Sequence, residues 1–143
     1  MAVVMVVDDD AETRATLKRF LERRGHHVVC AGHGKEALEL MSSNQPDLVV
    51  LDVRMPLVDG IEFLDVIRCY LRWQNLPVVV LTAYAEGTHI KRAAELGVLK
   101  VFLKGKFELE EMASYIESLN PPPGGQPSEH HRHWWFRERY LDL

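Results

Sequence analysis

The 143-residue sequence contains only two cysteines, Cys30 and Cys69. Two thiols are too few for a disulfide-stabilised scaffold, and their spacing matches no metal-binding motif. We therefore interpret both as small reduced residues of the core or the surface.

Long apolar runs are also missing. The chain has no stretch of about 18 apolar residues, the length that a membrane-spanning helix requires. No signal segment, with its basic start and apolar centre, opens the sequence. These absences predict a protein that does not insert into a membrane and that resides in the cytoplasm.

The sequence has no excess of basic charge. Its formal net charge is −4, and residues 129–143 contain three arginines and three acidic residues, so the whole excess lies in residues 1–119. A mildly acidic body lacks the basic patch that nucleic acids require. We therefore expect no direct binding to DNA or RNA.

What the first 119 residues do contain is a regular alternation of two patterns. Short apolar runs, typical of buried strands, occur at Val3–Val7, His27–Ala31, Leu48–Leu51, Val78–Leu81 and Val101–Leu103. Apolar residues at helical spacing separate or follow them, as in Leu17/Phe20/Leu21, Ala37/Leu38/Leu40/Met41, Leu64/Ile67/Leu71, Ile90/Ala93/Ala94 and Leu109/Met112/Ala113/Ile116/Leu119. Gly25 and Gly97 follow the first and fourth of these stripes as expected helix ends.

Five strands that alternate with five helices predict a parallel sheet with helices on both faces. For residues 1–119 we expect a flavodoxin-like doubly wound (βα)5 fold with strand order 2-1-3-4-5. The Pro/Gly-rich residues 120–128 are interpreted as a linker. Residues 129–143 form a tail that is rich in aromatic residues and histidine.

Polar residues stand at the carboxyl ends of these strands, the edge where doubly wound sheets bind ligands. They are Asp8, Asp9 and Asp10 after the first strand, Asp52 after the third, Thr82 after the fourth and Lys104 after the fifth. Clustered carboxylates repel one another unless a cation lies among them, and a few oxygen ligands suit Mg²⁺. A carboxylate nucleophile with a nearby ammonium and hydroxyl would fit phosphoryl transfer. Alternatively, the Asp8-Asp9-Asp10 run merely caps the first helix.

These motifs resemble those of the response-regulator receiver domains of bacterial two-component systems. Residues 52–60 match the family signature Asp-x-x-Met-Pro-x-x-Asp-Gly, which is the most specific of the similarities. Val6-Val7-Asp8-Asp9-Asp10 resembles the acidic pair after the first strand, and Leu81-Thr82-Ala83 resembles the fourth-strand signature. Gly97 stands seven residues before Lys104, as is usual in the family.

The resemblance implies a signalling protein and not an enzyme. In such a protein Asp52 would take a phosphoryl group from a histidine kinase or a phosphotransfer protein, and the phosphorylated protein would then act on a downstream protein. It implies that Asp9 and Asp52 bind Mg²⁺ or Mn²⁺ through their carboxylates, Arg54 through its backbone carbonyl, and Asp8 largely through a water. It also implies that Thr82 and Lys104 bind the phosphoryl oxygens. We expect no output domain in this chain.

Two positions depart from the family pattern. Gly105 replaces the proline that usually follows the lysine, so we expect a trans peptide bond or a more mobile loop there. Val101 replaces the usual Tyr or Phe, and strand alternation places the neighbouring Phe102 on the opposite face. These departures motivate an alternative, a pseudo-receiver that binds proteins without phosphorylation.

Two other classes fit less well. A hydrolase of the haloacid dehalogenase type would have an acid at position 54, where Arg54 stands, and an FMN protein would have a phosphate loop after the first strand.

The tail contains Trp134, Trp135, Phe136 and Tyr140. Such a cluster indicates contact with protein: this domain, a second copy in a homodimer, or a kinase. Phe136, Tyr140 and Leu143 have the spacing of a short amphipathic helix. The alternative is a disordered end or the stump of a longer protein. His130, His131 and His133 are not assigned as metal ligands.

Overall fold

In the computed structural model, residues 2–53, 59–83 and 88–119 are described, so the predicted linker (120–128) and tail (129–143) lie outside the described residues. Their five strands form one parallel sheet in the order β2-β1-β3-β4-β5, as predicted. The strands are β1 (Val3–Val7), β2 (His27–Ala31), β3 (Leu48–Leu51), β4 (Val78–Thr82) and β5 (Lys100–Leu103). The first three match the predicted apolar runs residue for residue, and the last two are each one residue longer.

Five helices connect or follow these strands. They are α1 (Ala11–Arg23), α2 (Gly34–Asn44), α3 (Gly60–Arg68), α4 (Thr88–Glu95) and α5 (Leu109–Leu119). As predicted, Gly25 and Gly97 follow α1 and α4 with φ angles of +90° and +80°, a backbone conformation that glycine adopts without steric cost.

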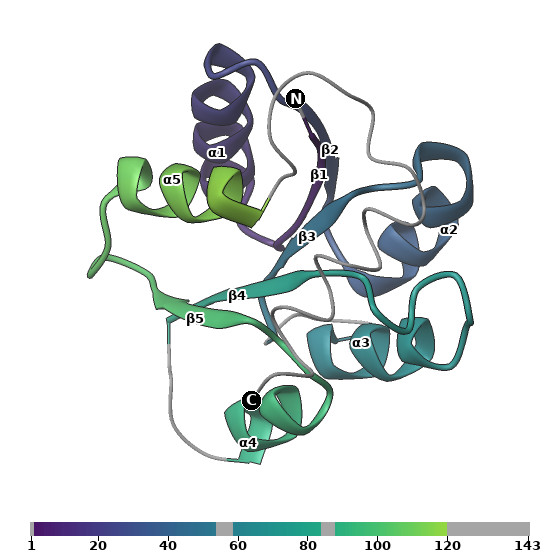
Figure 1. Cartoon of the computed structure of the whole chain (residues 1–143). Coiled ribbons are helices and arrows are strands. Elements are labelled where there is room, and N and C mark those ends of the chain that lie inside the picture. The colour runs from purple at the N-terminus through teal and green to yellow at the C-terminus, as the bar shows by residue number, and fades with distance from the viewer. Residues whose placement is uncertain (1, 54–58, 84–87, 120–143) are drawn as a thin grey trace. The chain divides into compact units, whose positions relative to one another are not determined.

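The core lies on both faces of the sheet, with α1 on one face and α2, α3 and α4 on the other (Figure 1). Alternate strand residues such as Met5, Val49 and Val80 pack against the buried side chains of α2 to α4. Their neighbours, such as Val6 and Val50, are equally buried on the α1 side. Burial on both faces explains why these strands are continuous apolar runs.

The chain divides into two compact units, one that ends at Leu109 and one that comprises the residues from Glu110 onward. Apart from its first residue, α5 belongs to the second unit. Its apolar residues Met112, Ala113, Ile116 and Leu119 follow one another at the spacing of a single helical face.

The predictions for two core residues, Ala94 and Leu71, are wrong. Ala94 is exposed because the neighbouring Ala93 faces the core from α4 and successive helix residues point in different directions. The helical spacing of Leu64, Ile67 and Leu71 suggested a continuous stripe, but α3 ends at Arg68 and the Leu71 side chain is 88% exposed. The Arg68 guanidinium donates hydrogen bonds to the carbonyls of Trp73, Leu76 and Leu96. These bonds hold the chain in a turn after α3, and Leu71 lies in that turn.

Candidate functional site

The strand register brings the predicted acidic residues together. Val7 in β1 pairs with Leu51 in β3, and the amide of Asp52 donates to the carbonyl of Val7 at 2.9 Å. Asp8 and Asp52 directly follow these paired residues, so they emerge side by side at the carboxyl end of the sheet. This edge lies at the point where the strand order reverses, which is the usual ligand site of such folds.

Asp8, Asp9 and Asp52 form a compact carboxylate cluster. Each offers one oxygen, and the three oxygens lie within 4.8 Å of one another. Asp8 and Asp52 are buried, whereas Asp9 is exposed. Oxygen ligands at this spacing, with one side open to water, suit a hard cation such as Mg²⁺ or Mn²⁺.

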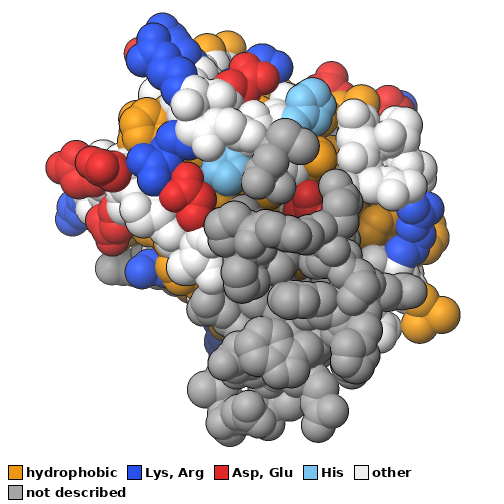
Figure 2. Space-filling model, turned by 45° about the horizontal axis from the view of Figure 1, so that its top comes forward, with side chains coloured by type: hydrophobic (Ala, Val, Ile, Leu, Met, Phe, Trp, Pro, Cys, Tyr) orange, Lys and Arg blue, Asp and Glu red, His pale blue; other side chains and the backbone are white. Residues whose placement is uncertain are grey.

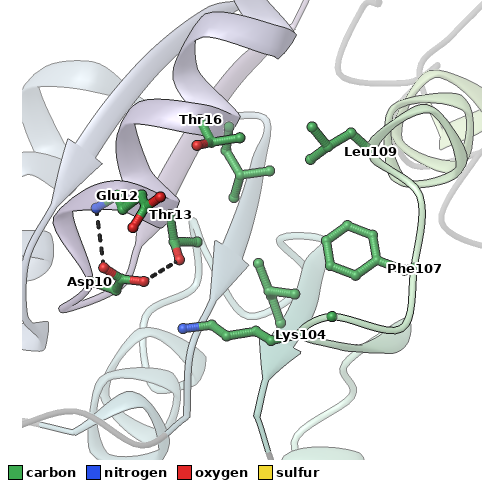
Figure 3. Close-up of a pocket in the computed structure, with 10 residues that line it drawn as sticks. Asp10, Glu12, Thr13, Thr16, Lys104, Phe107 and Leu109 are labelled. Carbon is green, nitrogen blue, oxygen red and sulfur yellow. Dashed lines mark hydrogen bonds between the residues drawn. The ribbon is translucent and has the colours of Figure 1, made fainter.

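Asp10 has a different role from its two neighbours. It is the N-cap of α1: its carboxylate accepts hydrogen bonds from the amide of Glu12 at 3.1 Å and from the hydroxyl of Thr13 at 2.7 Å (Figure 3). The alternative reading of the acidic run as a helix cap therefore holds for Asp10 alone. Asp8 and Asp9 belong to the cluster.

Lys104 reaches the same cluster from the end of β5. Its Nζ atom lies 2.9 Å from Oδ2 of Asp8 and 3.4 Å from Oδ2 of Asp52. Its backbone amide donates to the carbonyl of Thr82 at 2.8 Å, which ties the ends of β4 and β5 together. The side chain is 25% exposed, so it is accessible from the solvent side of the site.

Burial and charge shift the pKa values of this pair. Burial raises the pKa of Asp8, and the interactions with Lys104 and with the amide of Asp10 only partly oppose this shift. Burial alone would lower the pKa of Lys104, but the carboxylates of Asp8 and Asp52 outweigh it and raise that pKa. Lys104 is thus held firmly in its charged form.

One oxygen of the cluster lacks a well-aligned donor. Within the described residues, the buried Oδ2 of Asp8 accepts no hydrogen bond, although Lys104 lies at ion-pair distance. Its partner Oδ1 accepts the amide of Asp10 at 2.9 Å. Lys104 offsets only part of the cost of burying this carboxylate, because the pKa of Asp8 is still raised, and a cation bound among the three carboxylates would offset the rest. The residues present therefore fit a divalent metal.

Three further residues of the sequence motifs adjoin or belong to the predicted site: Thr82, Arg54 and Gly60. Thr82 is the last residue of β4 and is fully buried at the same edge of the sheet. Arg54 lies outside the described residues. A Cβ atom at Gly60 would lie only 2.2 Å from the backbone oxygen of Asp52, so glycine lets the start of α3 approach the cluster. The sequence signature contains Gly60 but does not reveal this contact.

The loop after Lys104 is a tight turn. The amide of Lys106 donates to the carbonyl of Leu103 at 3.0 Å, and Gly105 has a φ angle of +80°. A positive φ at the third position of a β-turn is typical of type II and favours glycine. The Lys104–Gly105 peptide bond is trans, which agrees with one of the two expectations for this loop.

Val101 and Phe102 point to opposite faces of the sheet, as the strand period predicts. Val101 packs against the core on the side of α2 to α4. Phe102 is buried and its ring centroid lies 5.5 Å from that of Phe107. No aromatic ring therefore stands at position 101, and the two phenylalanines pair away from it.

A pocket of about 350 Å³ adjoins the cluster between α1 and the loop after β5 (Figure 3). Its lining combines hydroxyl, charged and apolar groups: Asp10, Glu12, Thr13, Thr16, Leu17, Leu81, Lys104, Gly105, Phe107 and Leu109. Lys104 lines this pocket and also contacts Asp8 and Asp52. A group that enters the pocket would therefore lie beside the acidic cluster.

The face of the molecule drawn in Figure 2 has mixed charge. In Figure 2, the described Lys and Arg side chains are interspersed with Asp and Glu side chains and do not gather into one basic patch on the face shown. Among the described residues, no helix is long and apolar enough to span a lipid bilayer.

The fold and the site define a doubly wound α/β protein with three carboxylates and a lysine at its switch point. A family model described as "Response regulator receiver domain" matches residues 4–117. The chain therefore belongs to the response regulator receiver family, whose members are signalling domains of two-component phosphorelays. Such receivers interact with histidine kinases or phosphotransfer proteins.

Individual relatives agree with this membership. The chain is 33% identical over 118 residues to sporulation initiation phosphotransferase F of Bacillus subtilis, covering 82% of this chain and 93% of that protein. It is 38% identical over 116 residues to response regulator MprA of Mycolicibacterium vanbaalenii, covering 81% of this chain and 49% of MprA. It thus spans about half the length of MprA.

A solved structure shows the same fold. The non-phosphorylated HemR receiver domain of Leptospira biflexa superimposes with a TM-score of 0.74 at 32% identity, covering 87% of this chain and all of that domain.

Proposed function

We propose that this protein accepts a phosphoryl group on Asp52 from a phosphohistidine of a histidine kinase or a phosphotransfer protein. The observation that carries the proposal is the convergence of Asp52 with Asp8, Asp9 and Lys104 at one edge of the sheet. These groups are a nucleophile, a set of oxygen ligands and a fixed positive charge, the three components that phosphoryl transfer to a carboxylate needs.

In this reaction a carboxylate oxygen of Asp52 attacks the phosphorus atom. The new P–O bond forms as the P–N bond to the donor imidazole breaks, and the imidazole leaves as the neutral ring after taking a proton from water. Charge develops on the phosphoryl oxygens during this exchange. Lys104, 3.4 Å from Asp52 and held in its charged form, is placed to stabilise those oxygens.

Asp8, Asp9 and Asp52 would hold Mg²⁺ or Mn²⁺, with the backbone carbonyl of Arg54 as a further ligand. When bound, the cation would neutralise the phosphoryl oxygens and reduce the repulsion between the attacking carboxylate and the phosphate. The hydroxyl of Thr82 would bind a phosphoryl oxygen after transfer. The phosphorylated form would then be recognised by a downstream protein.

A pseudo-receiver that needs no phosphorylation is less favoured. Such a module has no use for buried carboxylates, which cost folding free energy when they lack a cation or another partner. Here Asp8 and Asp52 are buried, and the raised pKa of Asp8 indicates that Lys104 offsets only part of the cost of burying it.

The proposal is tested by incubating the protein with acetyl phosphate and Mg²⁺ and measuring its intact mass. We expect the mass of one phosphoryl group to be added, and we expect EDTA to prevent this addition. The matched control is Asp52→Asn, which keeps the shape of the side chain but lacks the nucleophile. An equal mass gain in wild type and Asp52→Asn would rule out Asp52 as the acceptor.

A further inference from the structure

Arg14 contacts the acidic cluster through the backbone. It lies in the second turn of α1, is half-buried, and donates a hydrogen bond from Nη1 to the carbonyl of Asp8 at 2.7 Å. We propose that Arg14 is a positioning residue that orients Asp8 and Asp9 for the cation. This inference depends on the proposed function, because it assigns Arg14 to the same metal-dependent site.

The contacted carbonyl controls both acids at once. It belongs to the peptide group that links Asp8 to Asp9, and this group is planar. The orientation of that plane is set by ψ of Asp8 and φ of Asp9, the backbone angles that adjoin both acidic residues. A hydrogen bond to this one oxygen therefore restrains the short backbone segment from which two of the three carboxylates project.

Among the described residues, no backbone hydrogen bond of the sheet reaches this carbonyl. The ladder between β1 and β2 ends with the pair Val7 and Ala31, and the last bond runs from the amide of Asp8 to the carbonyl of Ala31 at 3.1 Å. The carbonyl of Asp8 lies beyond the last strand pair. Arg14 supplies its donor from the helix, and a short bond from a charged donor is stronger than a neutral one.

The neighbouring strand end leaves room for this contact. A Cβ atom at Gly32, which follows β2, would lie 3.4 Å from Nη1 of Arg14. A larger side chain at position 32 would crowd the guanidinium. Groups that hold metal ligands in place, without touching the metal, typically change metal affinity by about 10- to 100-fold when removed.

The test is isothermal titration calorimetry with Mn²⁺ on the full chain, combined with urea unfolding in EDTA. Arg14→Met keeps much of the apolar stem but removes the donor, and we expect its dissociation constant for Mn²⁺ to rise about tenfold. Arg14→Lys keeps a charge and a donor but not the planar geometry. We expect it to recover most of the affinity and to remain about threefold weaker than wild type.

Lys18→Met is the matched control. Lys18 lies one turn further along α1 and donates to a backbone carbonyl of β2, that of Val28, at 3.3 Å, away from the cluster. Its loss removes the same charge from the same helix, and we expect unchanged Mn²⁺ affinity.

A wild-type affinity in folded Arg14→Met, with or without a loss of stability in urea, would overturn the proposal and leave Arg14 with a structural role at most. If Arg14→Met does not fold, Arg14→Ala, which also lacks the donor, takes its place, and a wild-type Mn²⁺ affinity in that variant overturns the proposal instead. Failure of the proposed function is distinguishable, because wild-type protein itself would then bind no Mn²⁺ and accept no phosphoryl group.

Discussion

Nζ of Lys104 lies 2.9 Å from Oδ2 of Asp8, although β1 and β5 are separated in the sheet by β3 and β4. The lysine thus extends along the carboxyl edge of the sheet to the buried carboxylate of Asp8. On its way it passes within 3.4 Å of Asp52. This one ion pair links the residue that we propose to bind the phosphoryl oxygens with a residue that we propose to hold the cation.

The raised pKa of Asp8 predicts an effect on stability. Burial places its folded-state pKa above the ordinary value of 3.8. The folded protein then binds this proton more tightly than the unfolded chain, so stability falls as pH rises through the interval above 3.8 and stays lower at neutral pH. We expect Asp8→Asn to raise the free energy of unfolding of the metal-free protein by on the order of 1 kcal/mol.

Urea unfolding in EDTA between acidic and neutral pH measures this effect. Asp10→Asn is the control, because hydrogen bonds from Thr13 and Glu12 lower the pKa of Asp10 and asparagine is an equally good N-cap, so no gain is expected. Addition of Mg²⁺ should stabilise wild type more than Asp8→Asn. If metal-free Asp8→Asn is less stable than metal-free wild type at neutral pH, the Asp8 carboxylate does not destabilise the folded protein and this prediction is contradicted.

Gly105 is predicted to position Lys104 through its turn. An alanine at a φ angle of +80° is strained by about 1–2 kcal/mol, and relaxation of that strain would move the neighbouring Lys104. We expect Gly105→Ala to lose stability and also to slow phosphorylation by acetyl phosphate several-fold. Gly97 has the same φ angle of +80° but lies outside the cluster. Gly97→Ala should therefore lose stability without a slower rate of phosphorylation. Equal rates in the two variants would argue against a positioning role for Gly105.

Gly60 is predicted to tolerate no side chain. A Cβ atom there would lie 2.2 Å from the backbone oxygen of Asp52 and 2.4 Å from Cα of Val53, and neither backbone atom can yield easily. We expect Gly60→Ala to reduce the free energy of unfolding by about 3 kcal/mol or more. Gly32→Ala, whose Cβ would meet only the end of the flexible Arg14 side chain at 3.4 Å, should cost less than about 1 kcal/mol. Chemical denaturation of both variants measures the difference.

The end of α3 gives a further comparison. Ile67 is fully buried and Leu71 is 88% exposed, although both fit the same helical spacing. We expect Ile67→Ala to cost about 2–5 kcal/mol and Leu71→Ser to change stability by less than about 0.5 kcal/mol. Similar losses of stability in the two variants, measured by thermal unfolding, would contradict the exposed position of Leu71.

Much of the fold was predictable because strands buried on both faces leave continuous apolar runs. Those runs end abruptly at Asp8, Asp52, Thr82 and Lys104, so the edge that carries the chemistry could be read from the sequence. The fold does bring together the four predicted residues Asp8, Asp9, Asp52 and Lys104.

Features that depend on tertiary contacts were not predictable. Leu71 continues the helical spacing of α3 by coincidence, whereas Arg68 and its three carbonyl partners hold the chain in a turn. Gln45 ends α2 with a φ angle of +42°, where the pattern offered no glycine. The bond from Arg14 to Asp8 depends on the direction of one long side chain, which residue spacing does not specify.

The central claim, that Asp52 is the phosphoryl acceptor, is tested most directly by locating the modification. After incubation with acetyl phosphate and Mg²⁺, reduction with borohydride converts an aspartyl phosphate to homoserine, and peptide mass spectrometry identifies the converted residue. We predict conversion of Asp52, with Asp8, Asp9 and Asp10 unchanged. Conversion at one of those neighbours, or at no residue while the protein remains folded, would contradict the account.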